Sequence, residues 1–136
     1  MKTKIVEETF DEITGTTTVT IQNKYGHFTG IAYCHPDDLE NFSQFQGERI
    51  ATTKANIEFC KHRIKQEKVK IKTLDNLLYD SHYLIMDPIF SHIKKQKDNY
   101  IKNIEYYENS ISILKDSIKQ MDDERQKVLL RSNKNK

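Results

Sequence analysis

Residues 50–80 read IATTKANIEFCKHRIKQEKVKIKTLDNLLYD, a stretch without glycine or proline. An aliphatic side chain returns there at every seventh position, at Ile50, Ile57, Ile64, Ile71 and Leu78. Cys60 and Leu74 extend the same apolar stripe. A sustained seven-residue repeat is typical of a helix that packs along another helix as in a coiled coil. The pattern predicts a first helix over residues 47–80, about 50 Å long at 1.5 Å per residue.

The same repeat returns later in the chain and predicts a second helix over residues 89–131, followed by a basic tail over 132–136. The connection between the two helices is short, so they should run antiparallel. The first position of the second repeat holds Ile93, Tyr100, Tyr107, Leu114, Met121 and Val128. The second position holds Ile104, Ile111 and Ile118, with Lys97 and Arg125 at its two ends.

The first 35 residues have a different pattern, rich in threonine and β-branched residues as strands are. Strands are predicted over 4–10, 16–22 and 27–33, separated by turn sequences. Val19 and Ile21 alternate with polar residues, so one face of the resulting antiparallel meander should face water. Gly30, inside the third strand, indicates a β-bulge, which we favour, or a close approach by a backbone or a ligand.

Together these elements predict an α+β fold in a single domain over residues 1–136. A small N-terminal antiparallel β-meander (1–35) and a connecting turn (36–46) precede a long antiparallel two-helix hairpin. The 136 residues include only 4 glycines and 2 prolines, which favours long regular elements over many tight turns. The first residues lack the apolar core that a signal peptide has, and no apolar run is long enough to span a membrane. We therefore expect a cytoplasmic protein in which Cys34 and Cys60 are reduced thiols.

Charge is distributed unevenly along the chain. Residues 1–49 have a net charge of −4 and residues 50–136 a net charge of +6. Basic side chains cluster over 61–72, over 94–102 and in the tail. Such clusters indicate either a surface for an anionic partner or the solvated outer face of long helices, and both interpretations stay open.

The apolar content of the helices exceeds what two helices and a small sheet can bury. Ile101, Ile113, Leu130 and the connection over 83–86 would stay partly exposed in a monomer. Exposed apolar patches of this kind mark interfaces. The sequence therefore predicts a homo-oligomer, either a dimer or an assembly of dimers.

Signals for catalysis are weak. Cys34-His35 and Cys60-Lys61-His62 match no usual zinc spacing, so no metal site is expected. The chain also has no phosphate-binding glycine loop and no nucleophile elbow. We expect a protein that is not an enzyme and needs no cofactor.

Signals for binding are stronger, because aromatic and cationic residues mix near the bend between the helices. Rings stack on bases and cations neutralise phosphates, although Tyr83 and Phe90 could equally plug the end of the hairpin. A second cluster, from Tyr33 to His35 and from Arg49 to Lys54, lies where a strand end meets a helix start. The backbone amides at that helix start could bind a phosphate. The alternative, that these residues only cap the helix and give it a polar surface, is somewhat favoured.

The run YGHFTGIAYCHPDD over residues 25–38, followed by Ser43, Gly47 and IATTKA over 50–55, resembles the phage-encoded Thoeris anti-defence proteins of the first type, the Tad-one sponges. The resemblance implies a phage immune-evasion protein that works in the cytoplasm of the infected bacterial host. Such proteins assemble from dimers and sequester cyclic nucleotide immune signals without cleaving them. Known ligands are cyclic ADP-ribose isomers and, for some members, cyclic di- or trinucleotides. Lys54 stands where the family pattern has arginine, which keeps a cation but loses planar bidentate contact.

The expected partners are therefore cyclic nucleotide signals and further copies of the chain, not a membrane. Alternatives are a protein-binding inhibitor of a host defence nuclease, and a basic coiled-coil protein that binds nucleic acid. The net charge of only +2 counts against the latter. The ligand-binding residues that we expect are Tyr25, Gly30, His35, Arg49, Lys54, His82, Tyr83, Phe90, His92, Lys94, Lys95, Asn99 and Arg125.

Overall fold

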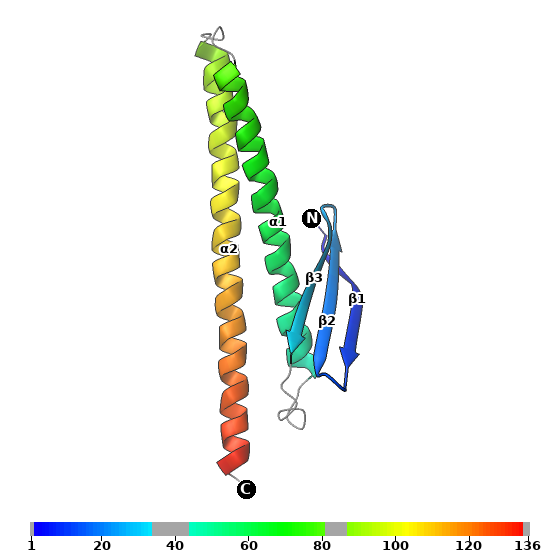
Figure 1. The fold of residues 1–136 in the computed structure, drawn as a ribbon. Helices are drawn as coiled ribbons and strands as arrows, with labels where there is room; N and C mark the ends of the chain where they lie inside the picture. Colours follow the sequence, from blue (N-terminus) through cyan, green and yellow to red (C-terminus); the bar gives the residue numbers. More distant parts are fainter. Residues whose placement is uncertain (1, 34–43, 81–86, 135–136) are drawn as a thin grey trace. The chain divides into compact units, whose positions relative to one another are not determined.

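The computed structural model describes residues 2–33, 44–80 and 87–134, and only the backbone at 44–45, 78–80, 87–89 and 125–134. The elements follow the predicted order (Figure 1). A three-stranded antiparallel sheet precedes two helices, so the predicted α+β class is confirmed. The elements are β1 (Lys4–Asp11), β2 (Thr16–Asn23), β3 (Gly26–Tyr33), α1 (Gln44–Asp80) and α2 (Asp87–Lys134).

The chain forms two compact units. The first contains Met1–Phe59 and Ser112–Lys136, that is, the sheet, the first part of α1 and the last part of α2. The second contains Cys60–Ile111, with the remaining parts of both helices. The expectation of a single domain over 1–136 stays a prediction. No helix in the described ranges is long and apolar enough to cross a membrane.

Local side-chain chemistry fixes the two turns of the sheet. In the first turn, Asp11 Oδ1 accepts hydrogen bonds from the amides of Ile13 (2.9 Å) and Thr14 (3.4 Å). The turn closes through Gly15, which has a φ of 67°, a conformation that glycine adopts readily. In the second turn, the amide of Tyr25 donates to Asn23 Oδ1 at 2.8 Å, and Gly26 has a φ of 129°. These local preferences set the β1-β2-β3 order.

One face of the sheet is buried and the other is open. On β2, Val19 and Ile21 are buried while the threonines between them are only half-buried, as the alternation predicts. On β1 the register shifts between Ile5 and Glu7. Ile5 pairs with Ile21 and Glu8 pairs with Val19, so both lie on the buried side. The extra residue of this bulge therefore turns Glu8 toward the interior face.

Gly30 sits under α1, and our interpretation of it as a bulge is wrong. It pairs with Val19 in an unbroken β2-β3 register, and the bulge lies on β1 instead. A Cβ at Gly30 would overlap the carbonyl oxygen of Ala51 and the amide nitrogen of Ala55. The second interpretation, a close backbone approach, is correct. Glycine is required there because the backbone of α1 occupies the space of a side chain.

The helix ends differ slightly from the predicted ones. α1 starts at Gln44 and includes Gly47, which we had placed at the boundary with a separate connecting turn. α2 begins at Asp87, with Pro88 in its first turn, where the missing amide hydrogen costs nothing. It continues to Lys134, so three residues of the predicted tail are helical.

The seven-residue repeats form the buried stripes of both helices. On α1, Ile50, Ile57 and Cys60 are buried, and Ile64, Ile71 and Leu74 are half-buried. On α2, Met121 is buried, and the other described apolar seam positions from Ile93 to Ile118 are half-buried. Ile101 and Ile113 are exposed in the single chain, and the predicted homo-oligomer would cover such side chains. The Leu130 side chain and residues 83–86, which the same prediction names, lie outside the described part.

Candidate functional site

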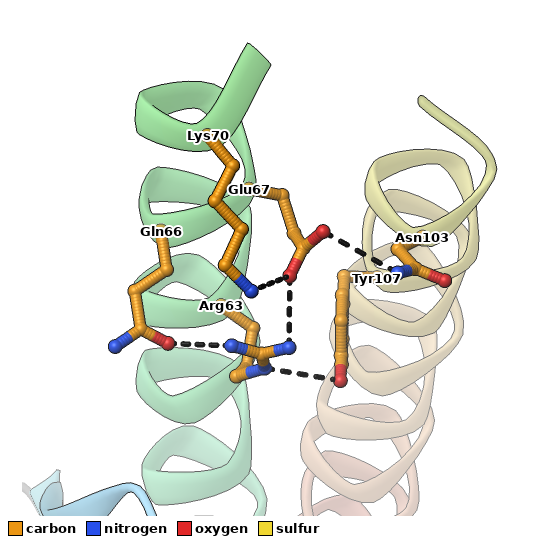
Figure 2. A network of polar contacts seen from close by, with 6 residues as sticks. All are labelled: Arg63, Gln66, Glu67, Lys70, Asn103 and Tyr107. Carbon is orange, nitrogen blue, oxygen red and sulfur yellow. Dashed lines mark hydrogen bonds and ion pairs between the residues drawn. The ribbon is translucent and has the colours of Figure 1, made fainter. Parts of the chain in front are cut away.

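A network of polar contacts joins the two helices inside the second unit (Figure 2). Arg63 and Glu67, one turn apart on α1, form an ion pair of 2.9 Å and are 8% and 1% exposed. The second Glu67 oxygen accepts from Asn103 Nδ2 of α2 at 3.3 Å. Arg63 Nε donates to the hydroxyl of Tyr107 at 3.3 Å. Glu67 follows Arg63 by four residues on α1, whereas its partner Asn103 precedes Tyr107 by four residues on α2. The two helices are therefore antiparallel in this unit.

Arg63 and Glu67 find their hydrogen-bond partners within the protein. Arg63 also donates to Gln66 Oε1 at 2.6 Å, and Lys70 Nζ lies 3.3 Å from Glu67 Oε1. A buried ion pair of this kind contributes little net stability, but it fixes which residues face each other, as a polar side chain at a coiled-coil seam does. We therefore assign these residues to helix register rather than to ligand binding.

Sequence reasoning missed this network. It interpreted residues 61–72, which include Arg63 and Glu67, only as a cluster of basic side chains. The sequence does contain a signal, because Glu67 stands seven residues after Cys60 and seven before Leu74, in the apolar stripe of α1. A charged residue at a buried seam position indicates a partner across the interface.

The expected binding residues at the start of α2 are exposed. Phe90 is 51% exposed, and His92, Lys94, Lys95 and Asn99 are also exposed. Phe90 and Lys94 are about one turn apart and share a side of the helix. Asn99 lies nine residues beyond Phe90, which is about two and a half turns, so it points to the opposite side, together with His92 and Lys95. One copy of α2 therefore presents these expected residues on two separate sides of the helix, and their role in binding stays a prediction.

Two further expected residues belong to the packing of the first unit. The Tyr25 ring lies 5.8 Å from the Phe59 ring, and Lys24 Nζ lies 5.1 Å from the Tyr25 ring centre. Phe28 packs edge-on against Phe59 at 5.3 Å. Gly30 faces the backbone of α1 as described above. The geometry thus explains both positions through the sheet-helix contact.

Arg49 lines an open pocket of about 320 Å³ in the first unit, together with Ile5, Glu8, Glu48, Thr52, Thr53, Ser117 and Met121. Loss of water around Glu8 raises the pKa of its carboxyl group, and the neighbouring Glu48 carboxylate raises it further by repulsion and a shared hydrogen bond. Lys54 is half-buried and is not among the lining residues.

The lining of this pocket is rich in hydrogen-bond acceptors. The hydroxyl groups of Thr52 and Thr53 donate to the carbonyl oxygens of Glu48 (2.6 Å) and Arg49 (2.8 Å), which leaves their lone pairs for a ligand. With two carboxyl groups against one guanidinium, the pocket favours a neutral or cationic group over an anion. Binding of a phosphate by Arg49 stays a prediction.

The remaining expected residues cannot be placed. His35, His82 and Tyr83 lie outside the described residues, as does the side chain of Arg125. Cys60 is a buried free thiol, and burial raises the pKa of that thiol, so it is a weak nucleophile. Across the described ranges, no three His, Cys, Asp or Glu side chains gather in a way that could hold a metal ion.

Comparison with known proteins finds no family model, no curated protein and no solved structure that matches this chain.

Proposed function

We propose that the protein captures small cyclic nucleotide signals and holds them without cleaving them, as the sponges that it resembles do. The observation that carries this proposal is the exposure of Phe90 and of Lys94, one helical turn further along the same side of α2. An exposed aromatic ring offers a stacking surface for a base, and a cation beside it neutralises a phosphate. Since capture is stoichiometric, the site needs tight binding and no catalytic group.

The two faces of α2 support a pocket built from more than one copy of the chain. Phe90 and Asn99 point to opposite sides of one helix, so a small ligand that touches both must take them from different copies. Such a pocket would also remove water from the charged contacts and strengthen them. The homo-oligomer expected from exposed Ile101 and Ile113 is part of this proposal.

Calorimetry on the full chain tests the proposal with cyclic ADP-ribose isomers and with cyclic di- and trinucleotides. We expect nanomolar binding of at least one of them, equivalent to about −12 kcal/mol. Loss of one stacking ring costs about 1–3 kcal/mol, so F90A should weaken binding by about 5- to 150-fold. Y106A is the control, because Tyr106 is another solvent-facing ring on the same helix, 67% exposed against 51% for Phe90.

Recovery of the ligand separates capture from catalysis. After heat release from the protein, mass analysis should return the nucleotide unaltered, whereas a cleaved product would indicate an enzyme. Absence of binding to every nucleotide at micromolar protein would refute the proposal. A stable complex with a host nuclease in its place would support the inhibitor alternative.

A further inference from the structure

The outer face of α2 carries a second seven-residue pattern, on the side of the helix turned away from its apolar seam. α2 is one helix of 48 residues, so side chains seven residues apart lie almost directly above one another. Two adjacent lines of such positions contain only exposed side chains, and together they form the outer face. The first line is His92, Asn99, Tyr106, Ile113 and Gln120, and the second is Lys95, Lys102, Asn109, Asp116 and Asp123.

The middle of the outer face is apolar. Tyr106 is 67% exposed and Ile113 is 69% exposed, more than any other large apolar side chain in the described part of α2. They follow each other on one line of the face, about 10 Å apart along the helix. Apolar side chains that gather on one line, rather than being scattered singly, indicate a surface that another molecule covers.

The charges on the outer face are sorted by sign around Asn109. Lys95 and Lys102 precede Asn109 by 14 and 7 residues, and Asp116 and Asp123 follow it by 7 and 14 residues. The order of charges read in one direction is therefore the opposite of the order read in the other direction. Within the part of the chain that the structure describes, none of these four side chains forms an ion pair. Such a face is complementary to itself when a second copy runs the opposite way.

We propose that the outer face of α2 binds a second copy of the chain, with the two α2 helices antiparallel and a two-fold axis close to Asn109. The two lysines of each copy then lie beside the two aspartates of the other copy, and Tyr106 of each lies beside Ile113 of the other. Parallel helices would place lysine against lysine and aspartate against aspartate, which is unfavourable. This interface rests on the proposed function only for its homo-oligomer, and it needs no bound nucleotide.

Sedimentation equilibrium of the full chain, without nucleotide, measures the dissociation constant of the dimer. K95E/K102E and D116K/D123K each replace contacts between opposite charges with contacts between like charges, so each should weaken the dimer at least about tenfold. An equimolar mixture of these two variants has only opposite charges across the interface and should dimerise as tightly as the parent chain. K115E/K119E is the matched control, because it reverses two exposed lysines on another side of α2. It should change the dissociation constant less than about twofold.

Cross-linking with a short bifunctional thiol reagent tests the direction of the helices. In the antiparallel pair, residue 102 of one copy lies beside residue 116 of the other, whereas the two copies of residue 102 are about 21 Å apart. A mixture of K102C and D116C should therefore give a cross-linked dimer, and neither variant alone should exceed the parent chain. Efficient cross-linking of either variant with itself would indicate parallel helices and would overturn the proposal.

The competing explanations give different results. Equal weakening by K115E/K119E would mean a general effect of charge and would overturn the proposal, as would an unchanged dissociation constant in a folded K95E/K102E or a mixture that fails to dimerise. A parent chain that stays monomeric but binds nucleotide would refute the interface and leave capture standing. A dimer with these responses that binds no nucleotide would support the interface and refute capture. If one variant does not fold by circular dichroism, the other charge variant and the cross-linking decide.

Discussion

Breaking the Arg63–Glu67 pair should destabilise the protein far more than removing both charges. In R63M the Glu67 carboxylate, 1% exposed, loses its closest cation and the Tyr107 hydroxyl loses a donor. Removing one partner of a buried pair costs about 3–5 kcal/mol. Lys70 Nζ at 3.3 Å and Asn103 at 3.3 Å still contact Glu67, so we expect the lower end, about 3 kcal/mol.

The double variant R63M/E67L removes both buried charges and fills the seam with apolar atoms. It should recover most of the lost stability, to within about 1 kcal/mol of the parent chain. Urea unfolding followed by circular dichroism at the helix band measures both values. K68A, an exposed neighbour on α1, is the control and should stay within about 0.5 kcal/mol. A loss below about 1 kcal/mol in R63M, or a double variant no more stable than R63M, would refute the reasoning.

Three other predictions concern the first unit and the exposed face of α2. G30A should destabilise by about 3 kcal/mol, because its methyl group overlaps the α1 backbone; an unchanged melting temperature would contradict this. The raised pKa of Glu8 stabilises the fold below the unfolded pKa of about 4.5, and this contribution is lost as pH rises through the folded pKa. E48Q should therefore shift the urea midpoint upward at pH 7 by a small amount, because Glu8 is exposed, and leave the midpoint unchanged at pH 3. E105Q, which changes an exposed carboxylate on α2, is the control and should show no pH-dependent gain. I113K places a charge at a side chain that is 69% exposed and should reduce the oligomer mass in sedimentation without loss of helix, while an unchanged mass would exclude Ile113 from the interface.

The strands could be predicted to within one residue because their signals are local. Turn residues such as Asp11, Asn23 and Gly26 determine where each strand ends, and the alternation on β2 determines which face is buried. Helix ends depend on capping and packing, so α1 and α2 extend two or three residues beyond the predicted limits. The bulge on β1 leaves no clear local signal, since the residues around Val6 read as an ordinary strand.

The candidate sites were harder to predict because they depend on register. The cluster at Phe90 and Lys94 could be found, since its members are close in sequence. The pocket lined by Arg49 and Glu8 could not, because β1 and α1 bring these residues together from distant parts of the sequence.

At Gly30 the backbone of β3 lies directly against the backbone of α1, so this position should tolerate mutation far less than its neighbours. Because no side chain takes part on the strand, no compensating exchange on the helix can make room for one there. In a saturation library, position 30 should accept glycine alone, while neighbouring Thr29 and Ile31, whose side chains point to the open face, should accept many residues. A single invariant column between two variable ones would be the genetic signature of this packing.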